Sequence, residues 1–261
     1  MSEAYTSDEM MTVAAARMLR NGAVCFVGIG LPSTAANLAR LTHAPDAVLV
    51  YESGPIGARP TVLPLSIGDG NLAETADTVV STPEIFRYWL QGGRIDVGFL
   101  GAAQLDKFAN INTTVVGPYG RPTVRLPGAG GAPEISSSAK EVLIIVKQSK
   151  RTFVEKLDFV TSVGFLTGGN AREAAGLCGN GPAAVITDLC ILRPDPDSRE
   201  LKVTSIHWGV NRETIVANTG WRIGFADSCE KTPSPTAPEL DTLRDLKART
   251  AVVHGTPGDR E

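Results

Sequence analysis

The chain has few of the residues from which metal sites and disulfide frameworks are built. Its four cysteines lie far apart, without a C-x-x-C pair or a histidine at metal-ligand spacing, and its three histidines are isolated. Zinc sites and disulfide frameworks both depend on closely grouped ligands or thiols. We therefore expect free thiols in a reducing cytosol and no metal site.

Long apolar runs and blocks of like charge are also absent. The run 142–146 has the length of a strand, far short of the ~20 residues that a membrane helix needs. The first ten residues are polar and acidic, unlike a secretory signal. Lys and Arg number 25 against 28 Asp and Glu, a net charge of −3. We expect a cytoplasmic protein with neither a membrane nor a nucleic-acid partner.

The chain does have the length and apolar content for an α/β core, with 261 residues of which 43% are hydrophobic. Its first third alternates strands and helices. The apolar run 23–27 is followed by a helix over 33–41 and by a second apolar run, 47–51. Thr6 and Glu9 have the spacing of a capping box, which predicts a helix at the start of the chain.

The pattern changes further along. Thr82 is expected to cap a helix, a strand follows at 97–100, and turn-forming residues over 104–125 predict hairpins and loops. The remaining expected elements are strands at 142–146, 183–187, 189–192 and 203–206 and a C-terminal helix over 238–248. The prediction is an α/β fold, an open mixed sheet with an antiparallel extension and flanking helices. We expect one domain, 1–261, with a short Pro-rich linker near 232–238.

Glu52 is the most informative side chain. It follows the apolar run 47–51 and precedes Ser53-Gly54-Pro55, which cannot continue a regular strand. In open α/β sheets ligands bind beyond the carboxyl ends of strands, and a carboxylate there is a competent nucleophile toward a thioester carbonyl. Ser53 and Gly54 would position it. The alternative is that Glu52 caps a loop or pairs with a cation such as Arg59.

A glycine loop is the second candidate element. Gly128, Gly130 and Gly131 lie within a stretch of eight residues, 126–133. Successive glycines let backbone N–H groups converge on an anion, which suits a developing oxyanion or a CoA phosphate. The alternative is a plain flexible surface loop.

A third feature suggests a different function. Gly28-x-Gly30 follows a strand and opens a helix, and an acidic residue ends the next strand, as in dinucleotide-binding proteins. The third position of that motif is Ser33 where Gly or Ala is expected. A nicotinamide-binding domain therefore stays open as a rival with an incomplete motif.

Several segments, taken in order, give a more specific indication. They are 27–32, 43–46, 51–54, 101–106, 128–132, 150–153, 158–162 and 185–188. The set resembles the beta-type chain of the glutaconate CoA-transferase branch of the family I coenzyme A transferases, over about residues 8–250. Many members carry Glu-Asn-Gly at the nucleophile, whereas this chain has Glu-Ser-Gly, as the glutaconate type does.

The resemblance implies the NagB/RpiA/CoA transferase-like fold and ping-pong chemistry on a CoA thioester substrate, with no permanently bound cofactor. Glu52 occupies the nucleophile position and would form a glutamyl-CoA thioester, while Gly128, Gly130 and Gly131 match the loop that lines the acyl site. The implied partner is an alpha-type subunit, in a hetero-oligomer of two chains of each type (α2β2) or larger.

Other functions on the same fold stay open. Relatives that lack the glutamate act as ring-cleaving hydrolases or as a decarboxylase, and a CoA-thioester hydrolase is also conceivable. A non-catalytic subunit that completes a partner's site is a further alternative. The acids used are not identified, although a dicarboxylate would need a cation, for which Arg59, Arg121 and Arg125 are candidates.

Overall fold

The computed structural model describes residues 5–255, which form two compact units. The first unit ends at Arg87 and resumes at Pro235, and the second runs from Tyr88 to Ser234. The Pro-rich stretch predicted near 232–238 contains the point at which the chain passes from the second unit back to the first. None of the helices within residues 5–255 has the length and apolar character to cross a membrane.

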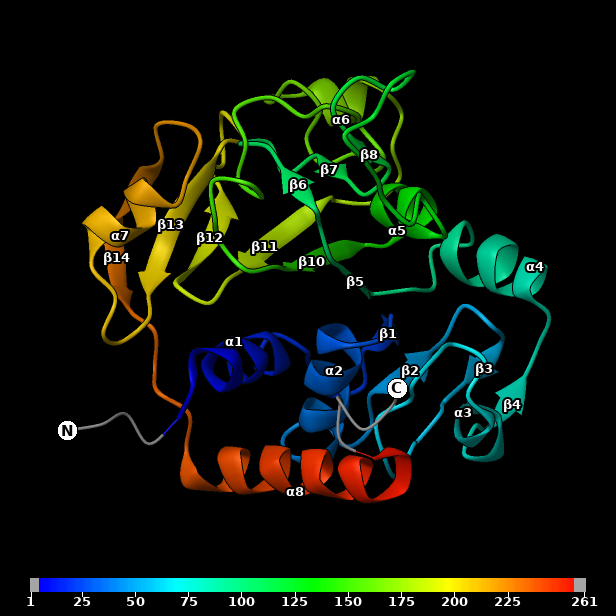
Figure 1. Ribbon diagram of the computed structural model, residues 1–261. Helices are drawn as coiled ribbons and strands as arrows, with labels where there is room; N and C mark the ends of the chain where they lie inside the picture. The colour runs from blue at the N-terminus through cyan, green and yellow to red at the C-terminus, as the bar shows by residue number, and fades with distance from the viewer. Residues whose placement is uncertain (1–4, 256–261) are drawn as a thin grey trace. The chain divides into compact units, whose positions relative to one another are not determined.

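The first unit contains four strands in the order β1-β2-β3-β4 (Figure 1). Their bounds are β1 (Val24–Phe26), β2 (Val48–Val50), β3 (Pro55–Ile56) and β4 (Thr78–Val79). β1 and β2 are parallel, whereas β3 and β4 are antiparallel to their neighbours. The strands predicted at 23–27 and 47–51 are confirmed. The helix between them, α2 (Leu31–Leu41), begins two residues earlier than expected because Pro32 fits a first helical turn.

Besides α2, the described part of the first unit contains α1 (Ser7–Ala16), α3 (Gly70–Glu74), α4 (Thr82–Glu84) and α8 (Ala237–His254). The capping box predicted for α1 is confirmed, with the Glu9 amide donating to the Thr6 hydroxyl at 3.2 Å and the Thr6 amide to the Glu9 carboxylate at 2.8 Å. α8 is longer than the predicted 238–248. Arg244 of α8 donates to both oxygens of Glu9 and holds the pKa of that carboxyl at about 2. This ion pair links α8 to α1.

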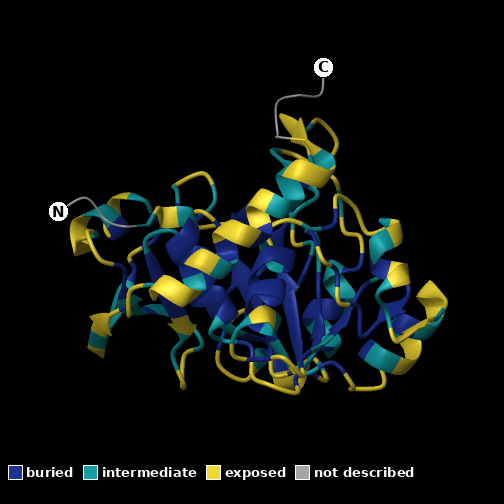
Figure 2. Ribbon diagram, turned by 90° about the horizontal axis from the view of Figure 1, so that it is seen from below, coloured by how far each residue is buried: buried dark blue, intermediate teal, exposed yellow. Residues whose placement is uncertain are grey.

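Six strands of the second unit lie side by side in the order β14-β13-β12-β11-β10-β5. Their bounds are β5 (Val97–Leu100), β10 (Glu141–Ile145), β11 (Pro182–Ile186), β12 (Cys190–Pro194), β13 (Leu201–Ile206) and β14 (Gly224–Lys231). β5, β10 and β11 are parallel, and β12 and β13 extend them in antiparallel fashion. Buried residues, dark blue in Figure 2, make up most of β5, β10 and β11. The mixed sheet and its antiparallel extension are thus confirmed.

The stretch predicted as hairpins forms two short antiparallel pairs within the second unit. These are β6 (Gln104–Leu105) with β7 (Ile111–Asn112), and β8 (Val115–Val116) with β9 (Val124–Arg125). Three short helices complete the unit: α5 (Ala132–Ser138), α6 (Ala171–Ala174) and α7 (Arg212–Ala217).

One predicted cap is wrong. The residue before α4 (Thr82–Glu84) is Ser81, and Thr82 is the first helical residue. Glu84 accepts hydrogen bonds from the amide of Ser81 at 2.9 Å and from its hydroxyl at 2.8 Å, so the acid three residues along selects Ser81 as the cap. A π-helical turn, η1 (Ile85–Leu90), continues α4.

A histidine that sequence reasoning left aside is buried in the second unit. His207 is 2% exposed, with Nε2 2.9 Å from the Thr187 carbonyl oxygen and Nδ1 2.9 Å from the Thr232 hydroxyl. Because a carbonyl can only accept, the ring proton lies on Nε2. Burial lowers the pKa of His207, so the folded protein keeps the ring neutral.

We expect the free energy of unfolding to fall as the pH drops below about 6.5, because the unfolded chain protonates His207 while the folded chain resists it. One proton gives a slope of at most about 1.4 kcal/mol per pH unit. Urea unfolding at a series of pH values should show a weaker slope for His207→Gln. The exposed residue His43 provides the control, His43→Gln, which should keep the wild-type slope. Equal slopes for wild type and His207→Gln would contradict this account.

Candidate active site

Glu52 lies in a tight turn directly beyond the carboxyl end of β2. The Gly54 amide donates to the Tyr51 carbonyl at 3.0 Å, and the Tyr51 amide donates to the Pro55 carbonyl at 3.0 Å. Glu52 and Ser53 therefore occupy the centre of the turn. Since β1 and β2 are parallel, the loop at Gly28 and Gly30 leaves β1 at the same edge of the strands.

The carboxylate of Glu52 is half-buried, and among residues 5–255 it forms neither a hydrogen bond nor an ion pair. The alternative in which Arg59 neutralises it is wrong. Arg59 instead donates to both carboxylate oxygens of Asp77, at 2.7 and 3.3 Å. A carboxylate without a protein cation keeps its lone pairs available for attack on a carbonyl carbon.

The residues after Glu52 fix the turn. Ser53 donates its hydroxyl hydrogen to the Ile67 carbonyl. Gly54 has a φ of +120°, and a Cβ there would lie 2.0 Å from the carbonyl oxygen of Val80. Only glycine satisfies both the dihedral angle and the close backbone contact.

The residue before Glu52 anchors the turn from the other side. Tyr51 is fully buried, and its hydroxyl lies 3.4 Å from the Ser33 hydroxyl in the first turn of α2. Asn37 donates to the Ser33 carbonyl at 2.9 Å. Burial raises the pKa of Tyr51, so the phenol stays protonated. Sequence reasoning missed Tyr51 and Ser33 as supports, because their contact joins two separate elements.

The glycine loop has a defined shape. Gly128 and Gly130 have φ angles of +103° and +49°. Gly128 is pinned to Thr113, whose carbonyl accepts from the Gly128 amide at 2.9 Å and whose hydroxyl donates to the Gly128 carbonyl at 2.8 Å. The amides of Gly130 and Gly131 donate to no backbone carbonyl within residues 5–255. Gly128 therefore shapes the loop, and of the two amides left without a backbone acceptor, that of Gly130 belongs to an exposed residue and that of Gly131 to a buried one.

A polar network that sequence reasoning did not single out supports this loop. Asn112 is fully buried and donates to Gln104 at 2.7 Å, and Gln104 donates to Asp158 at 2.7 Å. The Thr161 hydroxyl accepts from the Thr113 amide at 2.9 Å. Two segments that carry the family resemblance, 101–106 and 158–162, thus hold the strand end to which Gly128 is tied.

The predicted residues form two groups. Glu52, Ser53 and Gly54 share one turn in the first unit, and Gly128, Gly130 and Gly131 share one loop in the second. Within residues 5–255 no three of the His, Cys, Asp and Glu side chains are grouped as a metal site would require.

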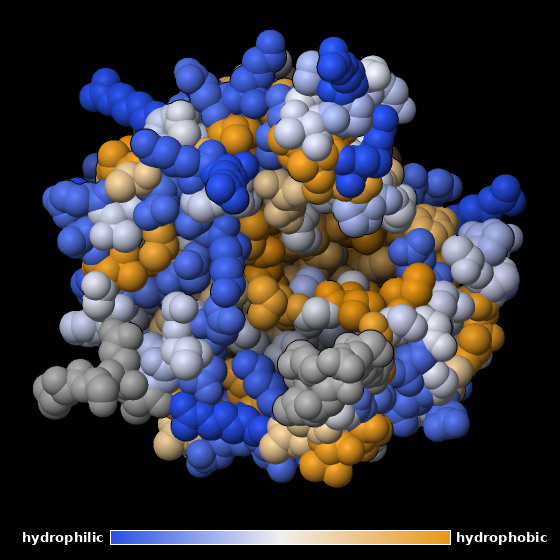
Figure 3. Space-filling model, in the orientation of Figure 1, coloured by the Kyte–Doolittle hydropathy of each residue, from blue (hydrophilic) through white to orange (hydrophobic). Residues whose placement is uncertain are grey.

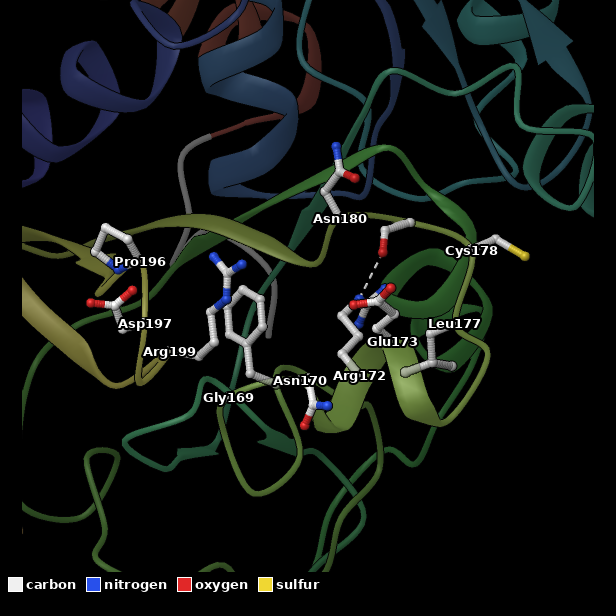
Figure 4. A pocket seen from close by; sticks show the side chains of 12 residues that line it. Gly169, Asn170, Arg172, Glu173, Leu177, Cys178, Asn180, Pro196, Asp197 and Arg199 are labelled. Atoms are coloured by element: carbon white, nitrogen blue, oxygen red, sulfur yellow. Dashed lines mark hydrogen bonds between the residues drawn. The ribbon is translucent and has the colours of Figure 1, made fainter.

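A pocket of 770 Å³ in the second unit contains none of the predicted residues (Figure 4). The guanidinium of Arg172, on α6, is buried there and donates to the carbonyls of Gly179, Gly164 and Ser136, at 2.7 to 2.9 Å. These bonds tie α6 to α5 and to neighbouring loops. Two acids balance the two arginines of the lining, so the pocket does not favour an anion. The charged lining residues are Arg172, Arg199, Glu173 and Asp197.

Comparisons with known proteins agree on one family. The family model described as coenzyme A transferase matches residues 8–218. The chain is 70% identical, over 99% of both sequences, to the beta-type chain of 3-oxoadipate CoA-transferase from Pseudomonas knackmussii. It is 33% identical to the corresponding chain of glutaconate CoA-transferase from Acidaminococcus fermentans, over 90% of this chain and 91% of the relative.

Solved structures give the same result. The crystal structure of glutaconate CoA-transferase from Acidaminococcus fermentans matches with a TM-score of 0.87 at 30% identity, covering 93% of this chain and 95% of the other. A more distant relative, the IpdB chain of the cholesterol ring-cleaving hydrolase from Mycobacterium tuberculosis, is 25% identical over 92% of this chain and 93% of its own length.

A mixed α/β fold with a carboxylate beyond a strand end is compatible with a class of enzymes that act on thioesters. Together with the matches above, it completes the assignment. The chain belongs to the coenzyme A transferase family and is a beta-type subunit of a CoA-transferase.

The Glu52 turn should not tolerate a side chain at Gly54. For Gly54→Ala we expect a loss of stability on the order of 2–4 kcal/mol, because the new Cβ would collide with the Val80 carbonyl. Gly28→Ala is the matched control, since nothing lies within 4 Å of a Cβ at that position. Thermal unfolding of both variants checks this expectation, and a Gly54→Ala protein as stable as Gly28→Ala would refute it.

Proposed function

We propose that this chain carries the nucleophile of a CoA-transferase that acts on 3-oxoadipate, with Glu52 as the residue that becomes acylated and then bound to CoA. The observation that carries the proposal is the Glu52 carboxylate, half-buried beyond a parallel strand and without a protein partner among residues 5–255. Ser53 and Gly54 position it through the turn.

The reaction proceeds in balanced steps. A Glu52 oxygen attacks the thioester carbonyl of the donor acyl-CoA and the C–S bond breaks. This releases the CoA thiolate and forms a mixed anhydride between the acyl group and Glu52. The thiolate then attacks the glutamyl carbonyl and releases the donor acid, which forms a glutamyl-CoA thioester. The acceptor acid reverses both steps. The amides of Gly130 and Gly131 stabilise the oxyanion that develops at the acyl carbonyl, while Gly128 holds the loop.

The substrate assignment rests on similarity. Identity of 70% over nearly the full length supports the acid named for the Pseudomonas knackmussii relative. The Glu-Ser-Gly sequence of the glutaconate type carries less weight, because at 33% identity that relative is far more distant. 3-Oxoadipate and glutaconate are both dicarboxylates, so each proposal requires a site for a second carboxylate.

The assembly is part of the proposal. The two CoA-transferase relatives are each named as one chain of an enzyme with more than one type of chain, which supports an alpha-type partner, in a complex of two chains of each type or larger. We propose that the two units of this chain act as one domain, that a CoA thioester serves as substrate with no resident cofactor, and that the complex works in the cytoplasm.

Replacing Glu52 tests the mechanism directly. In the complex with its alpha-type partner, Glu52→Gln should lose CoA transfer by on the order of 10⁴-fold or more, because the amide is a poor nucleophile. Glu74→Gln, at an exposed carboxylate of α3 in the same unit, should keep wild-type activity. Retained turnover by Glu52→Gln would defeat the proposal.

The covalent intermediate separates transfer from hydrolysis. After incubation with acyl-CoA and reduction with borohydride, mass spectrometry should find the Glu52 side chain converted to an alcohol. The relative named as a ring-cleaving hydrolase makes a hydrolase the second candidate. Release of free CoA without an acceptor acid, with Glu52 unmodified, would favour that candidate.

The need for a partner is a separate prediction. We expect the isolated chain to show no CoA transfer and the pair of chains to show full activity. Assay of each chain alone and of the reconstituted complex checks this. Full activity of the partner alone would make the present chain a non-catalytic subunit.

A further inference from the structure

Two exposed apolar side chains flank the turn that carries Glu52. Ile67 is 41% exposed and Val79 is 52% exposed. The Ser53 hydroxyl donates to the Ile67 carbonyl, and a Cβ at Gly54 would lie 3.4 Å from the methyl carbon Cγ1 of Val79. Glu52 precedes Gly54 by two residues, which span at most about 7 Å. Both apolar side chains therefore belong to the surface next to the proposed nucleophile, and all of these residues lie in the first unit.

The loop that carries Ile67 is held in place by polar contacts. Asp69, which caps α3, accepts from the amides of Leu65 and Asn71, at 3.2 and 3.1 Å. The Asp69 amide in turn donates to the Ser66 carbonyl at 3.2 Å. The loop thus keeps its shape while Ile67 and Leu65 stay exposed. A surface that is already fixed loses little conformational entropy when a ligand covers it.

Val79 lies on a strand at the edge of the sheet. β4 stands last in the order β1-β2-β3-β4 and, among the described strands, pairs with β3 alone. Figure 3 shows apolar surface, in orange, over the region of β3 and β4. An apolar side chain in such a place leaves water only when a ligand or another chain covers it.

The segment that carries both side chains is acidic. Residues 62–86 include four Asp and Glu and neither lysine nor arginine. Two arginines contact the chain just before this segment, where Arg40 donates to the Pro60 carbonyl at 3.1 Å and Arg249 to the Thr61 carbonyl at 2.6 Å. An anionic group placed over the segment would meet acids of the same stretch, whereas a neutral ligand with apolar groups would not be repelled. The charge pattern therefore favours an uncharged ligand.

A CoA thioester has an uncharged part directly beside its reactive carbonyl. The pantetheine arm consists of methylene groups, two amides and a carbon that bears two methyl groups, and it separates the thioester from the phosphates. Its extended length is on the order of 10 Å, since each amide unit spans about 3.5 Å. An arm whose sulfur lies at Glu52 is therefore long enough to cover the neighbouring surface. The dicarboxylic acid proposed as substrate, by contrast, carries charge at its far end.

We propose that Ile67 and Val79 bind the pantetheine arm of the CoA thioester and thereby align the thioester carbonyl with Glu52. The inference rests on the proposed function, because it takes Glu52 as the nucleophile. Contact with the methyl and methylene groups of the arm removes apolar surface from water. This binding energy is gained away from the reacting atoms and holds the carbonyl in position. Neither side chain makes or breaks a bond.

The test uses the complex with the alpha-type partner and a double variant, Ile67→Thr with Val79→Thr, which keeps branched side chains but removes apolar surface. The probe is S-methylpantetheine, a neutral thioether that cannot be acylated. It should compete with acyl-CoA in the wild type, and its inhibition constant should rise about tenfold in the double variant, because two methyl contacts are lost. The KM for acyl-CoA should rise in parallel, while the KM for the acceptor acid should change by less than about twofold.

Val252→Thr is the matched control, because Val252 is an exposed valine on α8 of the same unit. It should behave as wild type. Each single variant, Ile67→Thr or Val79→Thr, should raise the inhibition constant about threefold. Thermal unfolding and size-exclusion chromatography establish that every variant folds and assembles with the partner.

The outcomes separate the two proposals. If the wild-type complex transfers no CoA, the proposed function is wrong and this inference falls with it. If the wild type transfers CoA but S-methylpantetheine does not compete with acyl-CoA, or inhibits the double variant equally well, only the role of Ile67 and Val79 is refuted. A change confined to the KM of the acceptor acid would assign the surface to the acyl group instead. Loss of assembly would assign it to the partner chain, and either result overturns the inference.

Discussion

The catalytic proposal depends on the reversal of the chain directly after β2. Tyr51 is fully buried against α2, and Gly54 leaves no room for a Cβ beside the Val80 carbonyl. Between these two fixed points the backbone presents Glu52 without offering it a cation. Contacts made by the residues on either side thus leave the Glu52 carboxylate without a partner. A protein cation beside Glu52 would lower the basicity of its carboxylate and its reactivity as a nucleophile.

In the second unit, the groups that must be held in position are the backbone amides of the glycine loop. A free N–H group stabilises an oxyanion only if its direction is fixed before the reaction. The Gly128 amide donates to the Thr113 carbonyl, whereas the amides of Gly130 and Gly131 donate to no backbone carbonyl within residues 5–255. Hydrogen bonds among the side chains of Asn112, Gln104 and Asp158 hold the segment that carries Thr113. These polar side chains therefore position the glycine loop.

Relatives on this fold carry out different reactions, so the fold alone does not select transfer. A transferase must protect its acyl-enzyme from water and admit a second acid, whereas a hydrolase must admit water. The unpaired Glu52 favours the transfer proposal, because a free carboxylate can serve as the covalent carrier of CoA between the two acids.

Amino-acid order was sufficient to predict the strands near 23–27, 47–51 and 97–100, the capping box of α1 and the place of Glu52, because apolar runs and turn residues act between near neighbours in the chain. It missed β14, whose residues 224–231 show no apolar alternation. The ion pair of Arg59 with Asp77 and the hydrogen bond from the Gly128 amide to Thr113 could not be predicted in this way. Such partners lie 15 or more residues apart, and folding alone brings them within hydrogen-bond distance.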